Sequence, residues 1–362
     1  MKAINMRIIM LVDMDYFYAA CEELRRPELK GKPLVVGADP KNGAGRGVVY
    51  TCNYEARKYG LKSGMPISMA YRIKPDAFYV LPDFEYYEEM SKKVMEIIKE
   101  NADKFEQVSI DEAFVDVSKR ADGEKGARAL AEIVKNKVKD TLNLPCSVGI
   151  GPNKLIAKMA CNAAKPNGIM YVSENEAKKF IEEMPVNDMY GVGKKTAEKL
   201  ASMGYATIGQ LANANLMSIM DAFGAYGIEL HKNANAIDES EVQENYEVKS
   251  IGRERTFYEN TADTGQIIKT LREIGKEVHD EVEKSGFAFR VVTVKIRYSN
   301  FEEHMKSKSL ARASDSQDDI INTAIVLFSK YYENGEFVRK VGIRVSNLTN
   351  YKGQKKIGQF EK

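Results

Sequence analysis

Two adjacent carboxylates, Asp111 and Glu112, interrupt an apolar run, QVSIDEAFVD, at residues 107–116. The β-branched and aromatic residues around them are typical of a buried strand. Burying a carboxylate is costly unless it is paired, hydrogen-bonded or bound to a metal ion. Because neighbouring side chains on a strand point to opposite faces, both acids can reach one site only where the strand bends or ends. The pair therefore restricts both the fold and the chemistry of the chain.

A third acid, Asp13, follows another short apolar run in IIMLVDMDYFY. Three carboxylates that meet at strand ends suit hard divalent cations that prefer oxygen, above all Mg²⁺. Two such ions about 3.5–4 Å apart could clamp the attacking and leaving oxygens of a phosphoryl transfer. A structural alternative is equally compatible with the spacing: Asp13 caps a turn and Glu112 pairs with a lysine.

Length and composition set broad limits. At 362 residues the chain is too long for one ordinary core, so we expect two to four domains. Its 44% hydrophobic and 29% charged residues indicate a soluble, globular protein. The early apolar run IIMLV is too short for a membrane span or a signal peptide, which predicts a cytoplasmic protein.

Cysteines and net charge add little. The four cysteines are scattered, so disulfides and structural zinc are not expected. The net charge of +2 is weak evidence for a polyanionic partner.

The periodicity of the first half predicts an α+β unit built from distant pieces. Strand patterns cover 7–12, 106–117 and 146–151, and helical patterns cover 84–101 and 124–140. Residues 17–82 form a turn-rich insertion. Short helices with glycine breaks follow at 173–240, and the polar, acidic stretch at 238–247 is typical of a linker.

After the linker the pattern predicts a β-α-β-β-α-β domain with two helices on one face of a four-stranded antiparallel sheet. Its expected elements are strand 250–257, helix 264–285, strand 288–298, strand 304–312, helix 316–332 and strand 338–347. Basic residues alternate along three of the strands and indicate a basic outer face: Lys295, Arg297, Lys306, Lys308, Arg312, Lys340 and Arg344. Such a face fits a polyphosphate partner, although an ordinary solvated face is the alternative.

Two further stretches have phosphate-binding chemistry. Tyr54 and Arg57 lie three apart on a predicted helix, and Lys165 precedes a turn in AKPNG, so the two cations could contact the same phosphates. In MYGVGKKTAEKLASMG, the turn at 190–193 opens a helix whose free backbone N–H groups could hold a DNA phosphate. The residues concerned are Gly191, Gly193, Lys194 and Lys195. An ordinary helix connection or exposed surface residues are the alternatives.

Five motifs, in this order, resemble the Y-family DNA polymerases, in the branch called DinB or DNA polymerase IV. They are DMDYFYAACEE, GVVYTCNYEARKYGLKSGMP, SIDEAFVDV, VGIGPNKLIAKMACNAAKPNG and GVGKKTAEKL, and the resemblance extends to about residue 347. It implies an α+β multidomain, right-handed polymerase. The implied domains are a palm (1–16 and 83–172), fingers (17–82), a helix-hairpin-helix thumb (173–240), a linker (241–249) and a little finger (250–347), followed by a tail (348–362).

The resemblance also assigns the site. Asp13, Asp111, Glu112 and the carbonyl of Met14 would hold two Mg²⁺ ions, and Tyr18 would be the steric gate against ribose. Thr51, Tyr54, Arg57 and Lys165 match the triphosphate-binding positions. Asp15 is not a ligand in the family and is left structural.

The implied reaction is attack of a primer 3′-hydroxyl on a deoxynucleoside triphosphate, directed by a template. The family copies across damaged bases and has no proofreading. The implied partners are primed template DNA and dNTPs, and we expect a monomer without membrane contact.

Two positions depart from the family pattern. Tyr50 lies where relatives usually have a small residue over the forming base pair, and Tyr190 replaces a proline before the thumb turn. Two other classes remain as rivals: a non-catalytic helix-hairpin-helix DNA-binding protein, which leaves the three acids unexplained, and a palm-containing nucleotide cyclase, which leaves the DNA-binding elements unexplained.

The C-terminal tail, NYKGQKKIGQFEK, contains a partial clamp-binding motif. Gln354, Ile357 and Phe360 have the Q-x-x-I-x-x-F spacing, but Glu361 replaces a second aromatic residue. One helical turn would bring Ile357 and Phe360 together as a hydrophobic plug for a sliding-clamp pocket. The alternative is a frayed, basic terminus.

Overall fold

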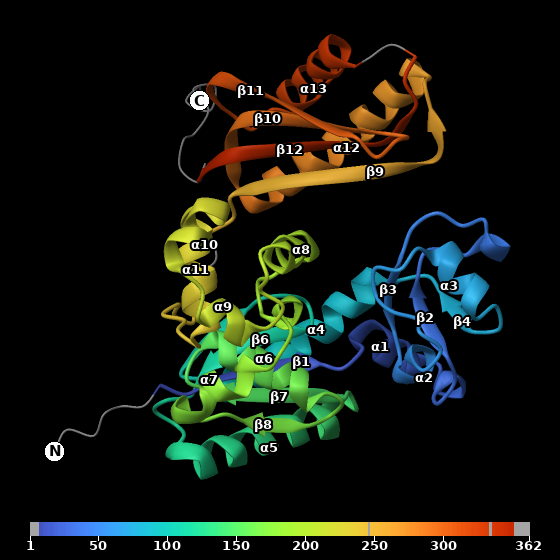
Figure 1. Cartoon of the computed structure of the whole chain (residues 1–362). Helices are drawn as coiled ribbons and strands as arrows, with labels where there is room; N and C mark the ends of the chain where they lie inside the picture. The colour runs from blue at the N-terminus through green and yellow to red at the C-terminus, as the bar shows by residue number, and fades with distance from the viewer. Residues whose placement is uncertain (1–6, 245–246, 333–334, 351–362) are drawn as a thin grey trace, which may run out of the picture. The chain divides into compact units, whose positions relative to one another are not determined.

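The computed structural model describes residues 7–244, 247–332 and 335–350, and the chain divides into two compact units, Met1–Asn245 and Tyr246–Lys362. Figure 1 shows the order of the elements in each unit. In the described part of the chain, no helix is long and apolar enough to span a membrane.

A five-stranded sheet forms the centre of the first unit, in the order β5-β6-β1-β7-β8. Its strands are β1 (Ile9–Met14), β5 (Lys104–Gln107), β6 (Glu112–Asp116), β7 (Cys146–Gly151) and β8 (Ile169–Tyr171). The central strand β1 is antiparallel to both β6 and β7. All six residues of β1 are buried, which accounts for its nearly continuous apolar sequence.

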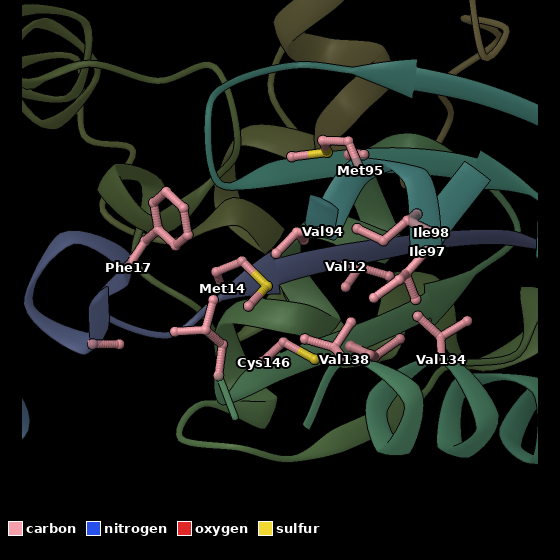
Figure 2. Packing of buried hydrophobic residues seen from close by; sticks show 14 of the residues in the cluster. Val12, Met14, Phe17, Val94, Met95, Ile97, Ile98, Val134, Val138 and Cys146 are labelled. Carbon is pink, nitrogen blue, oxygen red and sulfur yellow. The ribbon is translucent and has the colours of Figure 1, made fainter. Parts of the chain in front are cut away.

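Helices cover both faces of this sheet. On one face, α4 (Phe84–Glu100) and α5 (Gly123–Leu142) pack onto Val12 and Met14 of β1, as Figure 2 shows. On the other face, α6 (Lys154–Ala164) covers the alternate residues Ile9 and Leu11. Because side chains alternate along a strand, Asp13 continues the row formed by residues 9 and 11 and faces α6.

One strand prediction is wrong in an informative way. The stretch at 106–117 is not a single strand but the end of β5, a turn, and β6. Asp111 lies in the turn, and Glu112 is the first residue of β6. The chain therefore reverses direction at the two acids, which is the bend that two adjacent carboxylates need to reach one site.

The insertion at 17–82 has a small sheet of its own, in the order β3-β2-β4. Its elements are α1 (Phe17–Arg25), η1 (Pro27–Leu29), β2 (Leu34–Gly37), η2 (Lys41–Gly43), β3 (Val49–Cys52), α2 (Tyr54–Arg57), α3 (Ile67–Ile73) and β4 (Phe78–Val80). A separate buried cluster, which includes Val35, Leu61 and Ile67, joins β2, β3, α2 and α3. The buried residues of α1 and η1 belong instead to the core of the five-stranded sheet. The sequence did not predict this sheet because its strands are only three or four residues long.

Short helices follow β8, as predicted. They are α7 (Glu174–Glu182), η3 (Val186–Asp188), α8 (Lys194–Ser202), α9 (Ile208–Ala212), α10 (Leu216–Phe223) and α11 (Ala225–Ala234). Residues of the predicted linker also pack on this unit: Val242 is buried against β1 and α6, and the backbone N–H of Gln243 donates to Glu106 at 2.8 Å. The predicted linker therefore begins with residues that pack on the first unit.

The second unit has the predicted β-α-β-β-α-β order. Its elements are β9 (Ser250–Thr261), α12 (Thr264–Ser285), β10 (Phe287–Tyr298), β11 (Glu303–Ser314), α13 (Gln317–Tyr331) and β12 (Val338–Asn350). The strands form one antiparallel sheet in the order β11-β10-β12-β9. A single core joins the sheet to both helices.

Candidate active site

The three predicted acids lie together where β1 and β6 meet. Asp13 pairs directly with Glu112 in the antiparallel register, and the backbone N–H of Met14 donates to the carbonyl of Asp111 at 2.9 Å. A cavity opens beside them. Its lining residues are Asp13, Met14, Tyr16, Phe17, Tyr18, Tyr50, Thr51, Ser63, Ile110, Asp111 and Lys165.

Two lysines approach these acids. The ammonium of Lys158 contacts Asp13 at 3.1 Å and also pairs with Glu112. The ammonium of Lys165 contacts the other oxygen of Asp13 at 2.5 Å. The pairing of Glu112 with a lysine is part of the structural alternative considered from the sequence. It does not exclude a metal site, because an ammonium group and a metal ion are both attracted to the same cluster of carboxylates.

Sequence reasoning missed Lys158. It lies on α6 between the buried residues Ala157 and Met159, and its own side chain is largely buried. A lysine among buried positions of a helix needs a carboxylate partner, and that was the signal available in the sequence.

The pKa values of the three acids are shifted, in different directions. Burial alone would raise the pKa of Asp13, but the ammonium groups of Lys165 and Lys158 outweigh burial and place this pKa below its ordinary value. Burial raises the pKa of Asp111, where a hydrogen bond from Ser109 opposes the rise. Burial also raises the pKa of Glu112 in spite of Lys158.

The oxygen ligands at this site are of the kind that a hard cation prefers. In the structure, however, the carboxylates of Asp13 and Glu112 contact the ammonium groups of lysines. Three carboxylates and a backbone carbonyl are oxygen ligands of the kind that Mg²⁺ prefers. In the described residues, however, no group of three or more His, Cys, Asp or Glu side chains is close enough to hold a metal ion. The hydroxyl of Ser109 holds the Asp111 carboxylate at 2.6 Å, and Lys158 lies between the other two. Cation binding thus requires the acids to exchange these contacts.

An aromatic wall borders the cavity. Tyr18 stacks on Tyr87 with ring centroids 4.6 Å apart, and the edge of Phe84 contacts both rings. The ring of Tyr50 meets that of Phe84 edge-on, with centroids 5.6 Å apart, and Tyr50 is 43% exposed. Tyr50, the bulky residue that departs from the family pattern, therefore lines the same cavity as Tyr18 and is partly exposed to solvent.

The predicted phosphate-binding residues are only partly assembled. Thr51 and Lys165 line the cavity, whereas Tyr54 and Arg57 are not among its lining residues. The Arg57 guanidinium lies 4.9 Å from the centroid of the Tyr54 ring and donates to the carbonyl of Cys52 at 3.2 Å. Burial, and then Asp15, raises the pKa of Tyr54.

The glycine turn at 190–193 begins α8 as predicted. Gly191 has φ +88°, a conformation that glycine adopts readily, and its carbonyl accepts a hydrogen bond from Tyr226 at 2.8 Å. No side chain caps the first turn of α8, and Lys194 is exposed. Tyr190 contacts Phe114 edge-on at 6.4 Å. The turn thus presents backbone N–H groups beside a lysine.

The predicted basic face of the second unit needs a correction. Lys306 pairs with Val294, and Lys308 pairs with Val292. Directly paired residues share a face, so these two lysines lie on the helix-covered side. The contact of Lys306 with the Tyr331 ring of α13, at 4.9 Å, agrees with this placement. Arg312 falls where the register of β11 is irregular.

Four basic residues do share the outer face, but acids lie between them. Lys340 pairs with Arg297, and Arg344 pairs with Thr293 beside Lys295. Glu254 and Glu303 both bind Lys295, at 2.9 and 2.8 Å, while Lys340 also binds Glu254. The outer face is therefore mixed in charge rather than uniformly basic.

Comparison with known proteins decides the family. The impB/mucB/samB family matches residues 12–162, its C-terminal domain matches 248–358, and the IMS family HHH motif matches 174–205. A DNA polymerase IV of Methanoculleus marisnigri is 42% identical over 94% of both chains, and one of Lactococcus lactis subsp. cremoris is 37% identical over 94% of both chains. This chain belongs to the DNA polymerase IV branch of the Y-family DNA polymerases.

Solved structures agree with this assignment. A Y-family polymerase chimera of Dbh and Dpo4 matches with a TM-score of 0.85 and 31% identity, over 94% of this chain and 99% of that chain. The insertion ternary complex of Dbh DNA polymerase matches with a TM-score of 0.67 and 30% identity, over the same shares. The predicted fold class, family and enzyme class, a translesion DNA-directed DNA polymerase, are confirmed. The two rival classes are wrong.

Proposed function

We propose that this DNA polymerase IV transfers deoxynucleotides to a primer 3′-end at the junction of β1 and β6, with Asp13, Asp111 and Glu112 as metal ligands. The meeting of these three carboxylates at two strand ends is the observation that carries the proposal. The relevant metal is Mg²⁺, with two ions per site and the Met14 carbonyl as a further ligand. The boundaries given above for palm, fingers, thumb and little finger are part of this proposal.

When bound, Mg²⁺ activates the 3′-hydroxyl and neutralises charge on the departing pyrophosphate. The chain itself supplies orientation and charge. The Asp13 carboxylate is anionic next to Lys158 and Lys165, so it can exchange an ammonium for a metal ion. Tyr18 closes the side of the cavity where the sugar of the incoming nucleotide would lie, which excludes a 2′-hydroxyl by steric contact.

Residues from two segments bind the triphosphate in this proposal. Thr51, Tyr54 and Arg57 come from the insertion, and Lys165 follows α6. Arg57 would bind phosphate oxygens through two parallel N–H groups, whereas Lys165 would act as a point charge. The contact between Lys165 and Asp13 supports this role, because a lysine that reaches the acids also reaches phosphates held by them.

DNA would bind through its backbone. Gly191, Gly193, Lys194 and Lys195 would hold a phosphate at the first turn of α8. Further phosphate contacts are assigned to Lys295, Arg297 and Arg344 on the outer sheet face. Lys306 and Lys308 lie on the opposite face and are not part of this contact. The mixed charge of the outer face favours a weak, sequence-independent contact. Similar Dbh polymerases were solved as ternary complexes, which supports substrate binding by this chain but not the role of any single residue.

Primer extension tests the proposal. Purified protein, a primed template, dNTPs and Mg²⁺ should give products longer by single nucleotides, and EDTA should abolish them. Templates with defined lesions then measure bypass, since the family tolerates damaged bases. Extension that persists in EDTA would contradict metal dependence, and no extension on any primed template would contradict the function.

The clamp-binding motif, with Gln354, Ile357 and Phe360, lies outside the described residues. We propose that it recruits a sliding clamp, as the spacing predicts. Deleting residues 353–362 should leave extension on short primed DNA unchanged and abolish stimulation by the cognate clamp. Stimulation that survives the deletion would place the contact elsewhere. A monomer in the cytoplasm also remains a proposal.

A further inference from the structure

Asp15 is a fully buried acid to which the sequence assigns no role. Its side chain is 1% exposed, and its carboxylate accepts hydrogen bonds from Ser147, Tyr54 and Asn167. Ser147 donates from β7 to both oxygens, at 3.0 and 3.2 Å. Tyr54 donates its hydroxyl at 3.1 Å, and the backbone N–H of Asn167 donates at 2.7 Å. The carboxylate of Asp15 is therefore the shared acceptor of three donors.

The donors come from separate parts of the chain. Tyr54 is the first residue of α2 in the insertion, and Asn167 follows Lys165 by two residues in the turn after α6. Ser147 belongs to the central sheet and is fully buried, so it cannot touch a substrate. Asp15 therefore connects α2 of the insertion and the turn after α6 to strand β7 of the central sheet.

The backbone around Asp15 is itself fixed. Its N–H donates to the carbonyl of Pro145 at 3.1 Å. Tyr16, the next residue, has φ +39°, which is uncommon for a bulky side chain and persists only where the surroundings hold it. This conformation brings the Tyr16 ring edge-on to Tyr54, with centroids 5.1 Å apart. Tyr54 is thus held by Asp15 and Tyr16 together.

Both segments held by Asp15 carry the proposed phosphate-binding cations. On one side, the Tyr54 ring lies against the Arg57 guanidinium. On the other, the Asn167 turn fixes the chain just after Lys165, whose ammonium contacts Asp13. Cations that bind a triphosphate must be held in the bound geometry beforehand, since a small displacement is costly.

We propose that Asp15 is a positioning residue that holds the Tyr54–Arg57 helix and the Lys165 turn in register for the triphosphate of the incoming nucleotide. This inference rests on the proposed function, because it takes Arg57 and Lys165 as triphosphate ligands. Asp15 touches neither the metal nor the substrate. It acts through Tyr54 and Asn167.

Single-turnover kinetics of Asp15→Asn test the inference. The amide keeps the volume but replaces one acceptor oxygen by an N–H₂ group, so either Tyr54 or the N–H of Asn167 loses its acceptor and the two segments are no longer held together. We expect the apparent Kd for dNTP to rise about tenfold, with a smaller change in the maximal rate and in primer-template affinity. Ser147→Ala removes the hydroxyl that donates to both oxygens of Asp15, so the carboxylate is held less firmly, and this variant should raise the Kd for dNTP about threefold.

Asp103→Asn is the matched control. Asp103 likewise holds a distant segment, through the N–H of Lys119 at 2.8 Å and the guanidinium of Arg120 at 3.1 Å, but it contacts neither phosphate-binding segment. This control should change stability and leave the Kd for dNTP unchanged. An unchanged Kd in Asp15→Asn overturns the inference. If that variant does not fold, an unchanged Kd in Ser147→Ala overturns it.

Arg57→Ala and Lys165→Ala separate this inference from the proposed function. If both raise the Kd for dNTP while Asp15→Asn does not, the triphosphate site stands and the positioning role fails. If neither changes the Kd, the assignment of the triphosphate site itself fails.

Discussion

At the scale of single residues, Lys158 neutralises the acids that the proposed reaction requires. Asp13 and Glu112 are paired neighbours on adjacent strands, and both are largely buried. Two anions so close would repel strongly without a cation between them. Lys158 supplies that cation in the metal-free protein, and Mg²⁺ would take its place.

Replacing Lys158 by Met tests this exchange, because the side chain keeps its length and loses its charge. We expect the metal-free variant to lose on the order of 3 kcal/mol of unfolding free energy, since a buried ion pair then lacks one partner. Mg²⁺ should restore a large part of the loss. Urea denaturation with and without Mg²⁺ measures both effects.

Lys154→Met is the matched control for this experiment. Lys154 lies on the same helix and pairs with Glu106 at 2.8 Å, and both side chains are as buried as the Lys158 pair. Mg²⁺ should not restore the stability of this control. An equal response to Mg²⁺ in the two variants would contradict the exchange.

Tyr18 is the residue to which sugar discrimination is assigned. Its ring is held by stacking on Tyr87 and by the edge of Phe84, so it forms a firm wall of the cavity. Tyr18→Ala should raise ribonucleotide incorporation far more than it lowers dNTP incorporation, because the barrier is steric. Tyr50→Ala, which opens another part of the same cavity, serves as the comparison. Single-nucleotide kinetics with matched dNTP and rNTP decide it, and unchanged discrimination in Tyr18→Ala would assign the gate to another residue.

The sequence predicted some of these residues and not others, for physical reasons. Asp13, Asp111 and Glu112 stand out because acids rarely follow apolar runs without a function. Asp15 and Lys158 were missed because their partners lie at least 39 residues away in the chain. The apolar pattern around Lys158 indicates that it needs a carboxylate partner but does not say which one. Asp15 meets Asn167, and Lys158 meets Asp13.

At the scale of elements, the close approach of α6 to β7 places Lys158 over the acids. A Cβ atom on Gly149 of β7 would lie 2.1 Å from the carbonyl oxygen of Ala157 and from the N of Cys161. Both obstacles are backbone atoms of α6, so neither can move without moving the helix. Gly149 therefore sets the distance between the helix and the sheet.

Gly149→Ala should push α6 away from β7. We expect a loss of about 3 kcal/mol of unfolding free energy, as for other overpacked cores, together with reduced nucleotide incorporation. Gly193→Ala is the stability control, since a Cβ there meets nothing within 4 Å and its φ is negative. Denaturation by urea compares them, and a Gly149→Ala protein as stable as the wild type would contradict the packing argument.

Strand register explains why only some of the predicted basic residues lie on the outer face of the sheet. Alternation within one strand can be read from sequence, but the pairing of β10 with β11 decides whether Lys306 faces Lys295 or the helices. A shift of one residue moves every side chain to the other face. The ion pair of Glu303, the first residue of β11, depends on this register, and that of Glu254 depends on the register of β9 with β12.

Glu254 gives the outer face a dependence on pH. Burial would raise its pKa, but Lys340 and Lys295 outweigh burial and lower it. A lowered folded-state pKa adds stability above the unfolded value of about 4.3, and this stability is lost as the pH falls through the folded value. Glu254→Gln should therefore lose less stability than the wild type when the pH falls below about 4.3. Circular dichroism during urea denaturation measures this, with Glu259→Gln on the same strand as the control. Equal acid sensitivity in Glu254→Gln and the wild type would contradict it.

At the scale of the whole molecule, the order of motifs was more informative than any single motif. The acids, the phosphate-binding residues and the hairpin lie on five stretches between residues 13 and 195, and their order and spacing identified the family. Local patterns also predicted the second unit almost element by element, because its strands and helices are long. The packing of residues 241–243 on the first unit was missed because it depends on tertiary contacts of a polar segment.

Primer extension by Asp111→Asn tests the central claim, that the carboxylates at the junction of β1 and β6 carry out nucleotide transfer. The change removes one charge at nearly constant volume, and Asp111 lies in a turn whose backbone contact with Met14 does not involve the side chain. We predict a loss of at least about 10²-fold in nucleotide incorporation, with primer-template affinity and urea stability close to those of the wild type. Wild-type turnover by this variant would contradict the claim.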